Sequence, residues 1–270
     1  MRPQGVEFLE ASGVRVGRGG TSPDEKVRYV RRMFGAIAPR YDLANLFISA
    51  GLHRLWKRIT IDLAGVPAGG RALDVCCGTG DLALLLARRV GPGGRVVGVD
   101  FTPEMLEIAG RRAASSGYGE VCRFVAGDAQ AVPFPDDTFD AVTVGFGIRN
   151  VGHPEHALRE WRRVLRPGGR LAVLEFSRPR NPLIRGLYDG YSFTVMPWLG
   201  RVATRHPDAY LYLPASVRRW PDQDAFGAML RCAGFEQVRY RNFGSGITAV
   251  HLAIRPSASA VVSGVTYGGT

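Results

Sequence analysis

Hydrophobic and polar positions in the middle of the chain follow two alternating patterns. Short apolar runs rich in β-branched residues indicate strands, and the segments between most of them carry apolar residues at helical spacing. The strands are expected at residues 71–76, 95–100, 121–126, 139–145 and 170–176, and the helices at residues 82–90, 104–115 and 154–165. Because strands that are apolar throughout are buried on both faces, this alternation predicts an α/β fold with a mostly parallel sheet and helices on both faces.

Three further patterns complete the expected architecture. Residues 222–232 resemble a helix, and residues 235–242 and 247–254 a closing pair of strands, which brings the sheet to seven strands. Residues 23–64 have helical spacing and are expected to form a helical lead-in. Residues 181–202 are too apolar for an ordinary loop and too charged for a membrane span, so residues 178–220 are expected to be a helical insertion that covers the acceptor.

The ends of the chain lack this patterning. Residues 1–22 and 256–270 are rich in small residues without periodicity, and are expected to be disordered tails around a single domain of residues 23–255. Neither a signal peptide nor a long apolar run is visible. The chain is therefore expected to be cytoplasmic, either free or peripheral at the inner face of the membrane.

Charge and cysteine content exclude several classes of function. The net charge is +11, but Lys26 and Lys57 are the only lysines among 35 basic residues. This skew is more typical of genomic codon bias than of a nucleic-acid surface, although it also suits an anionic membrane. The cysteines, Cys76, Cys77, Cys122 and Cys232, form no CxxC pair, so neither a metal site nor a disulfide framework is expected.

The strongest chemical signal is the run RALDVCCGTGD at residues 71–81, followed by an acid, Asp100, at the end of the next strand. Gly78, Gly80 and Ala83 satisfy G-x-G-x-x-G/A, the glycine loop of a nucleotide-binding βαβ unit. A dinucleotide and S-adenosylmethionine both fit this layout. The residues four before the two lysines are Ser22 and His53, so the Tyr-x-x-x-Lys pair of short-chain oxidoreductases is absent, while other hydride-transfer enzymes stay open.

Features beyond the loop favour S-adenosylmethionine. Asp74 lies inside the first strand, where a carboxylate can face the cofactor's ammonium group. Asp128 follows the third strand and can accept from the adenine amine, and Asp100 can accept from both ribose hydroxyls. Together with residues 135–140 before the fourth strand and LRPGG at residues 165–169, these positions resemble the motif series of class I methyltransferases. Their usual first loop glycine is Cys76 here.

A narrower resemblance covers residues 24–254. Eight segments are similar to the ubiquinone/menaquinone biosynthesis C-methyltransferases: residues 41–45, 48–49, 53–58, 145–150, 163–169, 174–177, 221–223 and 233–235. The resemblance implies a class I, Rossmann-like fold with cofactor contacts at Asp74, Gly78, Thr79, Gly80, Asp100, Phe101, Asp128, Ala129 and Gly145. The loop at residues 76–79 and Gly145 look more like the menaquinone branch, where demethylmenaquinol is methylated, than like the dual ubiquinone branch.

That reaction needs a group that favours a phenolate. Forming one from a hydroquinone hydroxyl of pKa ~10 costs roughly 4 kcal/mol at pH 7. Arg149, beside Asn150 at the end of the fourth strand, can stabilise this charge through its fixed guanidinium. His53, Tyr41 and Asp42 from the lead-in are further candidates to approach the acceptor.

The expected partners are a prenylated quinol and a membrane surface, with a homodimer left open and nucleic acid not expected. Two alternative functions remain at this point. One is methylation of a ubiquinone precursor or of another aromatic or polyketide-like acceptor, and the other is a non-catalytic quinone-binding or assembly protein.

Overall fold

The seven predicted strands pair into one mixed sheet. In the computed structural model, which describes residues 22–195 and 207–257, the strand order is β3-β2-β1-β4-β5-β7-β6. The strands are β1 (Arg71–Val75), β2 (Arg95–Asp100), β3 (Cys122–Ala126), β4 (Phe139–Gly145), β5 (Leu165–Phe176), β6 (Glu236–Phe243) and β7 (Thr248–Ile254). The first five are parallel, and β7 runs antiparallel to both of its neighbours. The predicted class I, Rossmann-like fold is confirmed.

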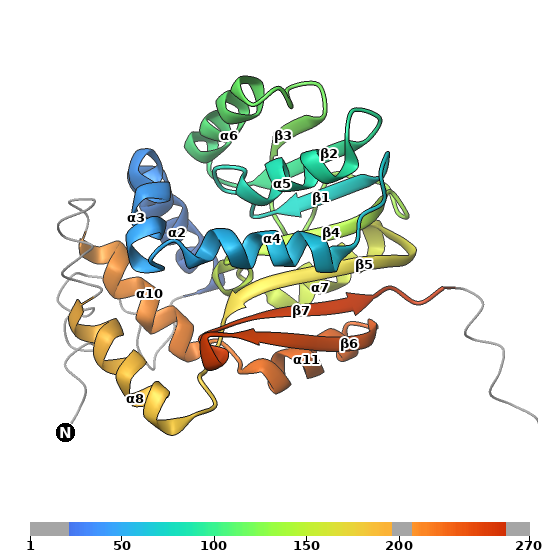
Figure 1. The fold of residues 1–270 in the computed structure, drawn as a ribbon. Coiled ribbons are helices and arrows are strands. Elements are labelled where there is room, and N and C mark those ends of the chain that lie inside the picture. Colours follow the sequence, from blue (N-terminus) through green and yellow to red (C-terminus); the bar gives the residue numbers. More distant parts are fainter. Residues whose placement is uncertain (1–21, 196–206, 258–270) are drawn as a thin grey trace, which may run out of the picture.

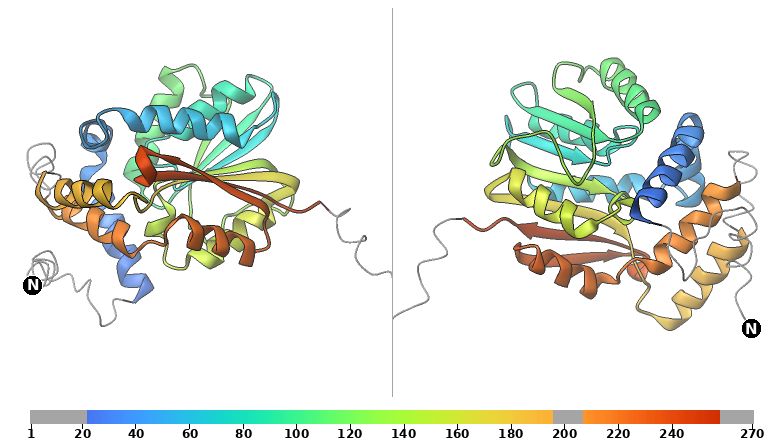
Figure 2. Two further views of the ribbon diagram at one scale, coloured as in Figure 1. Left: turned by 60° about the horizontal axis from the view of Figure 1, so that its bottom comes forward. Right: turned by 180° about the vertical axis from the view of Figure 1, so that it is seen from behind.

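Helices cover both faces of this sheet (Figures 1 and 2). One face packs on α4 (Leu52–Ala64), α5 (Asp81–Val90) and α6 (Pro103–Ser115), and the other on α7 (Pro154–Val164) and α11 (Gln223–Cys232). In α7, Pro154 begins the helix and the stripe Ala157, Leu158, Trp161 and Val164 has no exposed surface. This stripe repeats at the three- and four-residue spacing of an amphipathic helix, which explains why α7 forms here.

The predicted end of that helix differs from the structure by one residue. Leu165 was expected inside the helix, but it begins β5, where it pairs with Phe139 of β4. The register then shifts between Phe139 and Ala141, and Gly168 takes a φ of 79°. Residues 165–169 therefore form a bulged start of the strand as well as a helix stop.

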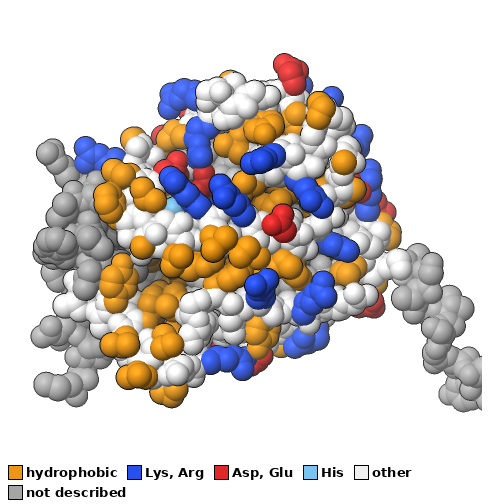
Figure 3. Space-filling view, in the orientation of Figure 1, with side chains coloured by type: hydrophobic (Ala, Val, Ile, Leu, Met, Phe, Trp, Pro, Cys, Tyr) orange, Lys and Arg blue, Asp and Glu red, His pale blue; other side chains and the backbone are white. Residues whose placement is uncertain are grey.

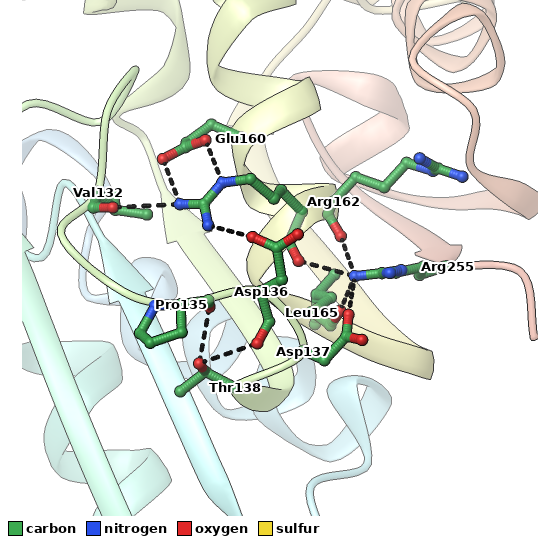
Figure 4. A network of polar contacts seen from close by, with 10 residues as sticks. Val132, Pro135, Asp136, Asp137, Thr138, Glu160, Arg162, Leu165 and Arg255 are labelled. Carbon is green, nitrogen blue, oxygen red and sulfur yellow. Dashed lines mark hydrogen bonds and ion pairs between the residues drawn. The ribbon is translucent and has the colours of Figure 1, made fainter.

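The motif at residues 135–140 lies at the start of β4, at the opposite end of the strand from Gly145. Figure 4 shows the polar contacts around it. Arg163 pairs with Asp136 at 2.6 Å and with Glu160 at 2.7 Å. Arg255 pairs with Asp137 at 2.5 Å and donates to the carbonyls of Arg162, Arg163 and Leu165. The motif thus connects α7, β4 and the end of β7 through ion pairs and hydrogen bonds, so its role is structural.

The lead-in and the insertion lie together at the other end of the sheet, where the parallel strands finish (Figure 1). The lead-in consists of α2 (Pro23–Ile37), η1 (Ala38–Arg40), α3 (Tyr41–Ile48) and α4. The described part of the insertion consists of α8 (Pro182–Gly190), η3 (Tyr191–Val195) and α10 (Pro207–Arg219). Tyr191 Oη donates to the carbonyl of Ile48 at 3.1 Å, which joins the two segments. The expected tails fall almost wholly outside the described residues.

Candidate active site

The glycine loop after β1 holds one carboxylate close to backbone donors. Gly78 N–H donates to Asp100 Oδ2 at 2.9 Å, and Thr102 N–H donates to Asp100 Oδ1 at 2.9 Å. Burial raises the pKa of Asp100, whereas these donors favour its ionised form. Cys76 has a left-handed φ of 53°, a conformation that costs a residue with a Cβ roughly 1–2 kcal/mol. The turn thus has a left-handed residue at the position where the usual glycine is replaced.

A cleft of about 970 Å³ opens beside this loop at the carboxyl ends of the strands. We call it the loop cleft. Six of the predicted cofactor residues line it, namely Gly78, Asp100, Phe101, Asp128, Ala129 and Gly145. Thr102 and Gln130 line it too, and so do Arg31 and Phe34 of α2, none of which the sequence motifs identified. Asp128 accepts from the backbone and the side chain of Gln130, and its remaining lone pairs are available to a ligand.

Three other predicted cofactor residues are not among those that line the cleft. Thr79 Oγ1 donates to Asp42 Oδ1 at 2.7 Å and is turned toward the lead-in. Gly80 caps α5, and a Cβ there would meet Ala109 at 3.1 Å. Asp74 is 1% exposed and accepts from Thr143 Oγ1 at 2.8 Å, and burial raises its pKa to about 7.

The loop cleft fits S-adenosylmethionine on two observations. A Cβ added at Gly78 would meet no atom within 4 Å, so the loop leaves room for a ligand to approach its backbone. Thr102 lines the cleft, and its Oγ1 is buried without a hydrogen-bond partner in the described residues. Orphaned buried polar atoms are uncommon in native proteins, and here a polar ligand would provide partners.

A second cavity of about 720 Å³ adjoins the loop cleft. We call it the helical pocket, because α2, α3 and α4 form most of its wall. The two cavities share Phe34, Tyr41 and Phe146. The helical pocket brings together three of the predicted catalytic residues, Tyr41, His53 and Arg149, among mostly apolar neighbours. The fourth, Asn150, lines the loop cleft, where its Oδ1 accepts from Tyr212 Oη at 2.9 Å.

Arg149 is held rigidly at the edge of the helical pocket. Its Nη1 pairs with Glu175 Oε1 at 2.7 Å and donates to the carbonyl of Phe146 at 2.6 Å, and its guanidinium carbon lies 5.3 Å from the centre of the Phe176 ring. Burial raises the pKa of Glu175, and Arg149 opposes this shift. Glu175 is a functional neighbour that sequence reasoning missed, although it lies within the quoted segment of residues 174–177.

Ion pairs join the lead-in to the glycine loop. Lys57 Nζ and Arg112 Nη2 each contact Asp81 at 2.6 Å. Arg112 Nη1 also pairs with Asp42 at 3.1 Å and donates to the carbonyl of Thr79 at 2.8 Å. These contacts hold α3 and α4 against the loop, so the walls of both cavities are connected.

Within the described residues, no group of three or more His, Cys, Asp or Glu side chains could hold a metal ion. No helix there is long and apolar enough to cross a membrane.

Comparisons with known proteins agree with this architecture. The model of the ubiE/COQ5 methyltransferase family matches residues 22–255. A relative named ubiquinone/menaquinone biosynthesis C-methyltransferase UbiE, from Ectopseudomonas mendocina (strain ymp), is 50% identical over 232 residues, which are 86% of this chain and 91% of the relative. The protein of the same name from Pseudomonas putida is 49% identical with the same coverage.

Solved structures share the fold at lower identity. The cyclase SpnF superposes with a TM-score of 0.63 at 20% identity, covering 85% of this chain and 96% of SpnF. A SAM-dependent methyltransferase from Aquifex aeolicus gives a TM-score of 0.56 at 19% identity, covering 87% and 99% of the two chains. With the family model and the UbiE relatives, these likenesses agree with the glycine loop and its acids: the chain belongs to the ubiE/COQ5 methyltransferase family, and its cofactor is S-adenosylmethionine.

Proposed function

We propose that this chain methylates a ring carbon of demethylmenaquinol to form menaquinol. The observation that carries the proposal is the junction of the two cavities at Phe34, Tyr41 and Phe146. A ligand in the loop cleft and an acceptor in the helical pocket can meet there. The apolar wall of the helical pocket suits a hydrophobic quinol, and the relatives named UbiE support quinone biosynthesis.

The charged residues of the helical pocket suit a phenolate. When bound, S-adenosylmethionine supplies a methyl group carried on a sulfonium. The ring carbon becomes a better nucleophile when a neighbouring hydroxyl loses its proton, at a cost of roughly 4 kcal/mol at pH 7. Arg149 and Lys57 both line the pocket, and fixed positive charges in a mostly apolar cavity lower that cost.

The preference for menaquinone over ubiquinone precursors rests on the loop at residues 76–79 and on Gly145. A Cβ at Gly145 would lie 2.8 Å from Leu82 Cδ1, so a serine there would require Leu82 to shift. Gly145 lines the loop cleft, and this change would alter its floor. The names of the relatives include both quinones, so an assay of substrate preference has to compare both.

The test is transfer of a labelled methyl group from S-adenosylmethionine to two reduced acceptors in detergent. Demethylmenaquinol should be methylated faster than the benzoquinol precursor of ubiquinone. Faster labelling of the benzoquinol, or of another phenol, would overturn the proposed substrate. Cofactor binding without any methylated product would instead favour the non-catalytic quinone-binding alternative.

We also propose that the protein works in the cytoplasm at the inner surface of the membrane. Among the described residues, the large hydrophobic side chains that are 47% to 73% exposed belong to the helices α3, α4 and α8: Leu43, Phe47, Leu52, Leu55, Leu183 and Leu187. In Figure 3, hydrophobic side chains are visible at the left of the molecule, where α3 and α8 lie in Figure 1. The same α3 and α4 line the helical pocket with their inner faces, so a quinol could enter from a bilayer beside them.

Sedimentation with liposomes containing anionic lipid and quinone checks this placement. The wild type should co-sediment at low salt, and Phe47→Ser/Leu187→Ser should bind less. Equal binding by both proteins, or no binding by the wild type, would contradict it.

A further inference from the structure

His53 lies at the start of α4, opposite the end of α3, and its ring nitrogen contacts a serine. Ser49 Oγ is 2.6 Å from His53 Nδ1 and 2.7 Å from the carbonyl oxygen of Asn45. Ser49 caps α3, so this hydroxyl sits in the short turn that joins the two helices.

The number of protons decides how these contacts are arranged. A serine hydroxyl has a single proton, and the carbonyl of Asn45 can only accept. Both contacts can therefore be hydrogen bonds at once only if Ser49 donates to Asn45 and His53 Nδ1–H donates to Ser49. The backbone N–H of His53 also donates to Ser49 Oγ, at 3.4 Å, which agrees with an accepting role for this oxygen.

The opposite nitrogen of the ring is left free for a ligand. His53 lines the helical pocket. Its Nε2 makes no hydrogen bond with the described residues and is not among their fully buried unpaired atoms. If Nδ1 carries the proton of the neutral ring, Nε2 has a lone pair that can accept one.

We propose that Ser49 is a positioning residue that holds the proton of His53 on Nδ1, so that Nε2 acts as the base for the acceptor's hydroxyl in the helical pocket. This inference rests on the proposed function. In the step, the quinol O–H bond breaks, its proton forms an N–H bond at Nε2, and the electron pair stays on the phenolate oxygen. After the methyl group is attached, the ring carbon loses its hydrogen as a proton while the oxygen regains one, so one proton is released per turnover.

Charged groups around His53 agree with a neutral ring at rest. Burial lowers the pKa of His53, and so do Lys57 and Arg54 on its own helix, while Asp81 of α5 and Asp42 of α3 act in the opposite direction. A phenolate formed next to the ring would face Lys57 and Arg149, which line the same pocket. His53 is a weak base, and the positive charges around it favour the phenolate that forms when it takes the proton.

The first experiment observes the tautomer directly and needs no substrate. Protein labelled with ¹⁵N-histidine is studied by NMR at pH 7.5, and the His53 signals are identified by their loss in His53→Gln. We expect a protonated Nδ1 and an unprotonated Nε2 in the wild type. Ser49→Ala should shift the population toward the Nε2–H form, and Ser49→Thr, which keeps the hydroxyl, should restore the wild-type pattern.

The second experiment measures turnover of demethylmenaquinol by the same variants. His53→Gln should lower kcat by about 10²–10⁴-fold, the contribution of a positioned base. Ser49→Ala should lower kcat by roughly 10- to 100-fold, a part of that contribution, with the KM for the cofactor unchanged. Ser115→Ala is the matched control, because this hydroxyl also donates to a backbone carbonyl in the last turn of a helix but does not line the pocket.

The outcomes separate this proposal from the proposed function. A wild type with its proton on Nε2, or Ser49→Ala with wild-type tautomer and kcat, would overturn the role of Ser49. A wild type that methylates only another acceptor would overturn the proposed substrate, while the NMR result and the kcat values on that acceptor would still decide the role of Ser49.

Discussion

Asp74 provides the sharpest test of how burial controls charge in this fold. It is 1% exposed, it receives a hydrogen bond from Thr143, and its other carboxylate oxygen has no partner among the described residues. Burial raises its pKa to about 7 from an ordinary value of 3.8. At about 1.4 kcal/mol per pH unit, this difference corresponds to about 4 kcal/mol of stability.

The sign follows from proton binding. Between about pH 4 and pH 7 the folded protein keeps a proton that the unfolded chain releases, so the free energy of unfolding falls as the pH rises. Above about pH 7 the full cost of the buried charge is present. The neutral amide of Asp74→Asn does not have this dependence. The difference in unfolding free energy, variant minus wild type, should therefore increase by about 4 kcal/mol from about pH 4 to about pH 8.

Urea unfolding of both proteins across this pH range measures the difference, and other titrating groups cancel because both proteins contain them. Glu107→Gln, which removes an exposed carboxylate paired with Arg111 on α6, is the control. A second readout is cofactor affinity, which should tighten as Asp74 ionises in the wild type and stay level in Asp74→Asn. If the two unfolding curves remain parallel within about 1 kcal/mol, the carboxylate is not buried as described and the reasoning fails.

Three further predictions follow from the packing and the site. Burial lowers the pKa of His251 to about 4, whereas the unfolded chain has about 6.5. The free energy of unfolding should therefore fall by about 3 kcal/mol as the pH drops from about 6.5 to about 4. Urea unfolding of His251→Gln should lack this fall, and a variant with the wild-type pH dependence would contradict the prediction. A Cβ at Gly147 would lie 2.4 Å from Cys76 Cβ, so Gly147→Ala should destabilise the fold by about 1–3 kcal/mol. Adding Cys76→Gly should recover most of this loss of stability. If the effects of the two substitutions are simply additive, the two side chains do not clash. Arg149→Lys keeps a positive charge beside Glu175 but loses the planar guanidinium, so kcat should fall by roughly 10- to 100-fold while cofactor affinity stays unchanged. Asp100→Ala should instead weaken cofactor binding. Calorimetry measures the affinity and kinetics the turnover, and unchanged turnover in Arg149→Lys would remove Arg149 from the reaction.

Local patterns were enough to predict the strands, the sheet class and the cofactor loop. Apolar runs and helical spacing depend on residues close in sequence, and these patterns predicted all seven strands to within a few residues. The largest difference is at β5, where the strand begins with the segment expected to end the helix. Pairing with a distant strand decided that boundary, because Leu165 contacts Phe139 of β4.

The site depended more on tertiary contacts. The motif at residues 135–140 resembles part of the methyltransferase series, yet its three acids pair with Arg163, Arg255 and Arg166 at the end of β4 away from the site. Thr79 lies in the glycine loop, but its hydroxyl donates a hydrogen bond to Asp42 of the lead-in. The partners in these contacts are distant from each other in sequence, so no local pattern could reveal the contacts.

The amino-acid sequence was enough to indicate the family and to favour its cofactor, because the glycine turn, the acids after the strands and the βαβ spacing are properties of short segments. Only the tertiary structure decided that Tyr41, His53 and Arg149 line one pocket, that this pocket meets the loop cleft at Phe146, and that Glu175 holds Arg149 in place. Tyr41 and His53 are about a hundred positions from Arg149, and Glu175 is 26 positions from it, so these contacts arise from the way the helices pack over the ends of the strands.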